Sequence, residues 1–110
     1  MARSRTDLLQ GTLDLLILKT LAPGPLHGYA IVQRLRLLSR EQLLVPQGSL
    51  YPALYRLEAS GAVASSWGKT DTGREAKFYR LTAAGEERLA EEADNWRRQS
   101  EAIGLVLAAG

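Results

Sequence analysis

The sequence predicts an α+β fold that is mostly α, and three observations lead to that prediction. Apolar residues recur at helical spacing in four segments of the chain. Two short strand-like segments flank a glycine-bounded loop between the third and the fourth helical segments. The 110 residues, 45% of them hydrophobic, are enough for one compact domain with an apolar core.

The first helix is expected over residues 6–21, where Leu9, Leu13 and Leu16 follow helical spacing. Further leucines lie on its other faces, so this helix has to be covered on more than one side. In so small a domain that pattern predicts a partner subunit. The helix ends at the Pro-Gly-Pro of residues 23–25, because proline cannot continue a helix.

A second helix is expected over residues 26–39, and a third from residue 46 or 49 to about residue 60. Gly28 permits a close backbone approach near the start of the second helix. Gly61 is a natural stop for the third helix. The buried face of the third helix is predicted by leucines at positions i, i+4 and i+7, which are Leu50, Leu54 and Leu57.

Two strands are expected over residues 63–67 and 76–81, joined by a charged loop. Trp67 on the first strand is expected to pack against the core. Thr82 has the character of an N-cap for a final helix over residues 83–107. The chain is therefore expected to divide into residues 1–81 and a C-terminal helix within residues 82–110.

The charge is unevenly distributed along the chain. Residues 1–80 carry eleven basic and six acidic side chains, whereas residues 81–110 carry three basic and six acidic ones. A basic body favours a polyanionic partner such as nucleic acid or an anionic membrane surface. A solvated surface with a chance imbalance is the alternative interpretation.

Three helices followed by a two-stranded ribbon form a winged helix-turn-helix, in which the third helix enters the DNA major groove and the ribbon, or wing, reaches the flanking backbone. The third helix carries groups suited to base edges and phosphates opposite its leucine stripe. These candidates for double-stranded DNA binding are Gln47, Gly48, Ser49, Tyr51, Pro52, Tyr55 and Arg56. The basic residues of the wing are Lys69, Arg74, Lys77 and Arg80; a solvated loop is the alternative for this part.

The final helix has a seam that repeats every seven residues, which predicts packing against a second chain together with the first helix. We expect a dimer interface formed by Leu9, Leu13, Leu16, Leu89, Ala93, Trp96, Ile103 and Leu107.

Four blocks of the sequence resemble the PadR family of bacterial transcriptional regulators, in order and with matching gaps. They are GTLDLLIL at residues 11–18, GPLHGYAI at 24–31, GSLYPALYRLE at 48–58 and KFYRLTAAG at 77–85. The resemblance covers nearly the whole chain and implies a homodimeric winged-helix repressor that binds a palindromic operator and is released by a small molecule or a stress signal.

The resemblance also implies roles for individual residues. It makes Gly48, Ser49, Tyr51, Pro52 and Tyr55 DNA-reading positions and Lys77 a wing contact. It implies that the first and the final helix form the dimer interface. Because the chain ends after one C-terminal helix, it is similar to the short members, in some of which a tryptophan between the subunits stacks on planar aromatic drugs. Trp96 is therefore a candidate effector contact, and a hydrophobic plug in the dimer seam is the alternative.

Other functions are excluded by what the sequence lacks. Without cysteine there are no disulfides, thiolate metal sites or cysteine nucleophiles. His27 is the only histidine, so we expect no catalytic residue, metal site or cofactor, and give His27 a local turn or packing role. With no signal peptide or membrane span, a cytoplasmic protein is expected. A protein-interaction winged helix, or a small-molecule sensor without a DNA role, stays open as the alternative.

Overall fold

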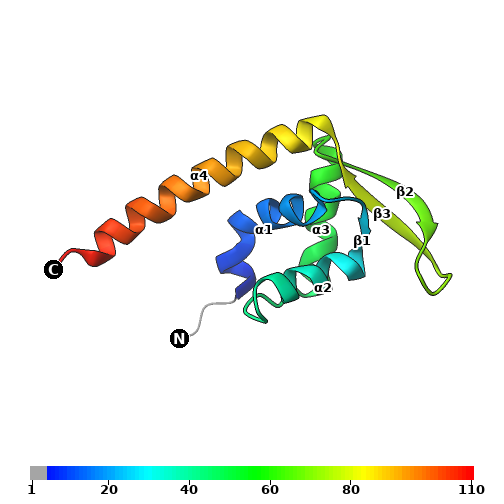
Figure 1. Ribbon diagram of the computed structural model, residues 1–110, viewed down its shortest axis with the longest axis horizontal. Helices are drawn as coiled ribbons and strands as arrows, with labels where there is room; N and C mark the ends of the chain where they lie inside the picture. The colour runs from blue at the N-terminus through cyan, green and yellow to red at the C-terminus, as the bar shows by residue number, and fades with distance from the viewer. Residues whose placement is uncertain (1–4) are drawn as a thin grey trace.

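The structure, a computed structural model, describes residues 5–110, with side chains from Thr12 onward. Figure 1 shows the shorter helices gathered at the centre, a β-hairpin projecting to one side and a long helix projecting to the other. This arrangement confirms the mostly α winged-helix fold with a C-terminal helix. The elements are α1 (Arg5–Leu21), β1 (Leu26–His27), α2 (Gly28–Leu38), α3 (Gln47–Ala59), β2 (Val63–Lys69), β3 (Glu75–Leu81) and α4 (Ala83–Ala108).

Helix α1 lies at the centre of the domain, in contact with α2, α3, α4 and β3. Its residues Leu13, Ile17 and Leu18 are buried among the chain's own helices. These three residues are therefore covered by this chain, and a partner subunit for the rest of α1 stays a prediction. Leu13, 5% exposed, is a core residue rather than an interface residue. Leu9 lies outside the described side chains.

Helix α2 begins at Gly28, two residues later than the sequence predicted. Leu26 and His27 instead form the short strand β1, which pairs antiparallel with Tyr79 and Phe78 of β3. His27 is the N-cap of α2, where its Nδ1 accepts the Ala30 N–H at 3.4 Å. Its ring also meets the Phe78 ring edge-on at 5.3 Å. Helical periodicity could not reveal β1, because the strand depends on a partner far along the chain.

Helix α3 packs into the core as the leucine spacing predicted. Leu50, Leu54 and Leu57 are fully buried, and Pro46 is the N-cap residue, in an extended conformation. Gly61 follows the helix with φ of +84°, a backbone conformation that glycine adopts without strain.

The three strands form one antiparallel sheet in the order β1-β3-β2. Val63 pairs with Leu81 and Trp67 pairs with Lys77, so these four side chains share one face. Val63 and Tyr79 of this face are buried against the helices. The hairpin is longer than predicted, since β2 continues to Lys69 and β3 begins at Glu75.

Helix α4 starts on the domain and then leaves it (Figure 1). Thr82 caps it as predicted: its Oγ1 accepts the Gly85 N–H at 3.1 Å and donates to the Gly61 carbonyl oxygen at 2.6 Å. Gly85 is buried and Leu89 packs against the core. All residues from 94 to 110 are exposed. Over residues 5–110, no helix is long and apolar enough to cross a bilayer.

Candidate nucleic-acid interface

The exposed face of α3 presents two tyrosines four residues apart. The exposed fractions are 46% for Tyr51 and 76% for Tyr55. Gln47, Gly48 and Pro52 are exposed beside them, and Ser49 is half-buried. Opposite the buried leucines, α3 therefore exposes hydroxyl and amide groups that can form hydrogen bonds, together with Gly48 and Pro52, which add little bulk. This composition suits contact with a DNA groove.

Gly28 sets the position of Tyr51. A Cβ atom on Gly28 would lie 2.5 Å from Tyr51 Oη and 2.9 Å from its Cζ, closer than atoms can approach. The tyrosine ring therefore lies across the start of α2, where only a glycine leaves room for it. The sequence predicted a close approach to the backbone at Gly28, and the group that approaches it is the Tyr51 side chain.

A groove of about 630 Å³ separates the start of α2 and the Tyr51 side chain from the hairpin turn. Tyr29 and Tyr51 line it on the helical side. The hairpin side is lined by Thr70, Asp71, Thr72, Arg74 and Glu75. Hydroxyl and guanidinium groups are donors to phosphate oxygens. The Arg74 guanidinium and the hydroxyl groups can therefore donate to a sugar-phosphate backbone, while the Asp71 and Glu75 carboxylates of the same groove repel it.

Lys77 occupies the hairpin face that is turned toward the helices. Its Nζ lies 3.9 Å from Glu58 Oε1 and 5.9 Å from the centroid of the Tyr79 ring. Glu58 also accepts a hydrogen bond from Ser65 Oγ at 2.6 Å, which ties α3 to β2. Burial of the Tyr79 phenol raises its pKa, and the neighbouring Glu58 carboxylate adds to the effect. The Lys77 ammonium group thus lies beside the C-terminal end of α3. Lys77 is exposed, as are Lys69, Arg74 and Arg80.

Trp67 does not pack against the core, so that expectation was wrong. It is 72% exposed, on the strand position directly opposite Lys77. The hairpin extends beyond the helices at this point, and an inward-facing side chain there has nothing to cover it. The strand β2 continues two residues beyond Trp67, to Lys69, so Trp67 lies on the part of the strand that extends past the helices.

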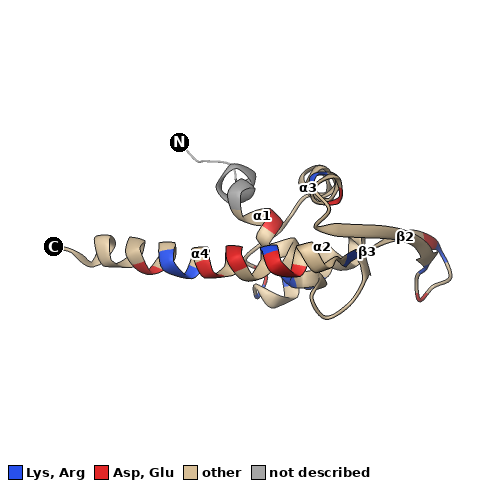
Figure 2. Cartoon of the chain, turned by 90° about the horizontal axis from the view of Figure 1, so that it is seen from above, with Lys and Arg blue, Asp and Glu red and all other residues tan. Residues whose placement is uncertain are grey.

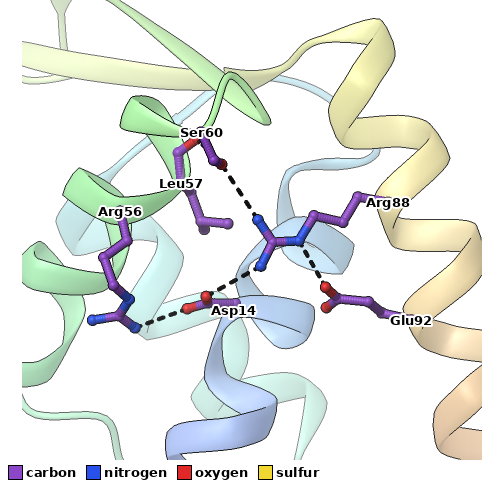
Figure 3. A network of polar contacts seen from close by, with 6 residues as sticks. All are labelled: Asp14, Arg56, Leu57, Ser60, Arg88 and Glu92. Carbon is purple, nitrogen blue, oxygen red and sulfur yellow. Dashed lines mark hydrogen bonds and ion pairs between the residues drawn. The ribbon is translucent and has the colours of Figure 1, made fainter.

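Arg56 is not brought together with the two exposed tyrosines. Its Nη2 donates to Asp14 Oδ1 of α1 at 3.0 Å, so the side chain turns toward α1 (Figure 3). Asp14 also accepts from Arg88 of α4, at 3.4 Å. In this structure Arg56 belongs to a polar network at the junction of three helices.

The residues expected at a dimer interface fall into two groups. Leu16 and Leu89 are partly buried and pack against the core, and Ala93 is half-buried. Trp96, 48% exposed, and Ile103, Leu105, Val106 and Leu107 are exposed. The far half of α4 thus carries a concentration of apolar surface that its own chain does not cover.

Acidic and basic residues both occur along α4 (Figure 2). They pair within the helix, as in Arg88 with Glu92 and Arg98 with Asp94, both at 2.7 Å. The acidic balance of this segment is therefore partly neutralised locally. Among the described residues, no group of three or more His, Asp and Glu side chains could hold a metal ion.

Residues 17–91 match the transcriptional regulator PadR-like family. A transcriptional regulator of Mycobacterium tuberculosis is 41% identical over 76 residues, which are 69% of this chain and 67% of that protein. A transcriptional regulator from Clostridium thermocellum superposes with a TM-score of 0.81 at 28% identity, covering 89% of this chain and 95% of that one. A PadR-like transcriptional regulator from Bacillus cereus has the same TM-score at 25% identity, covering 97% of this chain and all of that one.

Proposed function

Because the chain belongs to the PadR-like family of DNA-binding transcriptional regulators, which are not enzymes, we propose that it is a homodimeric repressor of a palindromic operator. In this proposal α3 of each subunit enters a major groove and the β2–β3 hairpin follows the adjacent backbone. The residues that would contact DNA are Gln47, Gly48, Ser49, Tyr51, Pro52, Tyr55, Lys69, Arg74 and Lys77.

The observation that carries the proposal is the facing arrangement of α3 and the hairpin. Tyr51 borders a groove whose other side is the hairpin turn with Arg74. Lys77 lies on the hairpin face that is turned toward α3 and is held there by Glu58. A duplex against α3 would therefore bring a phosphate strand past the Tyr51 hydroxyl on one side and past Arg74 and Lys77 on the other, where Asp71 and Glu75 also lie.

The exposed apolar residues of α4 support a dimer. Trp96 and Ile103 are seven residues apart, and Leu107 follows four residues later, so they recur along one side of the helix. A contiguous apolar surface exposed to water on a protein marks a site of interaction with another molecule. The family resemblance implies that a second α4 covers this apolar surface. A two-fold axis through the contact between the two α4 helices would place one α3 helix at each of two half-sites.

Effector release would act through the same contact. Trp96 is half-exposed on α4, where a planar aromatic compound could stack on it once two subunits meet. A compound that binds better to a dimer with wrongly spaced α3 helices must lower its affinity for DNA.

Selection of bound duplexes from random DNA tests the proposal. The expected result is an inverted repeat whose half-sites are about one helical turn, ~34 Å, or a small multiple of it apart. No enrichment, or enrichment of single unpaired half-sites, would contradict it. The alternative of a protein-interaction winged helix predicts no enrichment from a chain that still dimerises.

A further inference from the structure

One carboxylate of α1 links α3 to α4, and we infer that Asp14 positions the DNA-reading helix relative to the dimer helix. The inference rests on the proposed function. Asp14 Oδ1 accepts from Arg56 of α3 at 3.0 Å, and Asp14 Oδ2 accepts from Arg88 of α4 at 3.4 Å. Figure 3 shows the two guanidinium groups approaching the same carboxylate from different helices.

Arg88 also reaches α3 without passing through Asp14. Its Nη1 donates to Oγ of Ser60, the C-cap residue of α3, at 3.3 Å, and its Nε donates to Glu92 Oε2 at 2.7 Å. Ser60 Oγ in turn donates to the Leu57 carbonyl oxygen at 2.9 Å. A planar guanidinium can serve three acceptors at once because its donors point in fixed directions. Arg88 therefore fixes α4 against the end of α3.

The Asp14–Arg88 pair is more sheltered than the ion pairs that Asp94 forms on α4. The Asp14 side chain is 18% exposed and that of Arg88 is 33% exposed, whereas the Arg98–Asp94 pair is 69% and 52% exposed. Water screens partly buried charges less than exposed ones. The network also joins residues from three separate helices, so it constrains tertiary geometry rather than a single helical turn.

The consequence lies in how the proposed dimer presents its two α3 helices. Helix α4 packs directly against α1 and β3. Asp14 and Arg88 add the link from α4 to α3. If α4 forms the dimer contact, the angle at this link sets the distance between the two α3 helices. Loss of the link would widen the range of distances between the two α3 helices and lower the affinity of the dimer for an operator of fixed half-site spacing.

The test compares Asp14→Asn and Arg88→Gln with a matched control, Glu41→Gln. Glu41 pairs with Arg36 at the end of α2 and takes no part in the network. The chain contains no cysteine, so a single Gln47→Cys substitution allows one spin label per subunit at the start of α3. The interspin distance is measured in the DNA-free dimer, and operator affinity is measured with unlabelled protein.

We expect a broader or shifted interspin distance in Asp14→Asn and Arg88→Gln, and affinity that is weaker by about fivefold or more. We also expect poorer discrimination between operators that differ by one base pair in spacing, a change that a loss of stability alone would not produce. Glu41→Gln should match the unmodified chain in all three measurements. If Asp14→Asn does not fold, Arg88→Gln decides, since it leaves the Asp14–Arg56 pair in place.

Two sets of results distinguish a failure of the inference from a failure of the proposed function. Folded Asp14→Asn and Arg88→Gln dimers with unchanged distance, affinity and spacing preference would overturn the inference alone. An unsubstituted chain that does not dimerise or does not bind DNA would overturn the proposed function and the inference with it.

Discussion

Substitution of Gly28 by alanine should weaken DNA binding without unfolding the protein. The new Cβ atom would lie 2.5 Å from Tyr51 Oη, whereas an ordinary contact begins near 3.4 Å. The tyrosine hydroxyl therefore has to move by roughly 1 Å. The clashing atoms are the far end of a flexible side chain, so the move is possible, and alanine in place of glycine stabilises a helical position by about 0.5–1 kcal/mol. We expect a net change in the free energy of unfolding within about 1 kcal/mol.

The effect on DNA affinity should be larger than the effect on stability. If Tyr51 donates to a phosphate, the lost hydrogen bond to a charged group costs about 1.5 kcal/mol in each subunit. Two subunits give about 3 kcal/mol, or roughly a hundredfold weaker binding. Fluorescence anisotropy of a labelled operator measures this change, and thermal unfolding measures stability.

A double-mutant cycle with Tyr51→Phe checks the assigned cause. Tyr51→Phe removes the hydroxyl that would contact DNA, so adding Gly28→Ala to it should cost little further affinity. Gly28→Ala with unchanged operator affinity would refute the reasoning, as would affinity losses that simply add in the double variant.

Three further outcomes follow from other parts of the fold. Gly85→Ala places a Cβ atom 2.0 Å from the Ala62 carbonyl oxygen, which is a backbone atom and cannot rotate away. Calorimetry should show that the variant loses about 2 kcal/mol or more of unfolding free energy. An unchanged Tm would contradict the packing described. The pKa of Tyr79 is raised in the folded state, so this group stabilises the fold below the ordinary pKa of 10.0, and the stabilisation is lost as the pH rises toward the folded-state pKa. Chemical unfolding above about pH 10 should thus show a smaller loss of unfolding free energy in Tyr79→Phe than in the unsubstituted chain. Equal losses in the two proteins would contradict this prediction. Ile103→Glu on exposed α4 should leave the monomer folded and shift the dimer to monomer in sedimentation; a fully dimeric variant would argue against an α4 interface.

Local patterns in the sequence predict most of the fold. The leucines of α3 lie on one face because their spacing is helical, and Thr82 caps α4 because its hydroxyl can reach the Gly85 N–H. Tyr51 and Tyr55 could be assigned to the exposed face by the same periodicity. Such features depend on residues within a few positions of one another.

The features that the sequence did not reveal depend on distant parts of the chain. Leu26 and His27 form β1 only because β3 lies beside them. Arg56 turns away from the two tyrosines because the Asp14 carboxylate of α1 attracts it. Trp67 stays exposed because the hairpin extends past the helices. Periodicity measures how apolar each face is, and it cannot tell whether the cover comes from this chain or from a partner.

The salt dependence of operator binding tests the central claim that α3 and the hairpin together hold a duplex. Affinity of the unsubstituted chain for its selected operator should fall steeply with salt, because phosphate contacts release counterions. Lys77→Gln should reduce the slope of log affinity against log salt by about 2, one contact per subunit. Lys19→Gln, which removes the same charge from an exposed position on α1, should leave the slope unchanged. A salt-independent affinity, or equal slopes for both variants, would contradict the account.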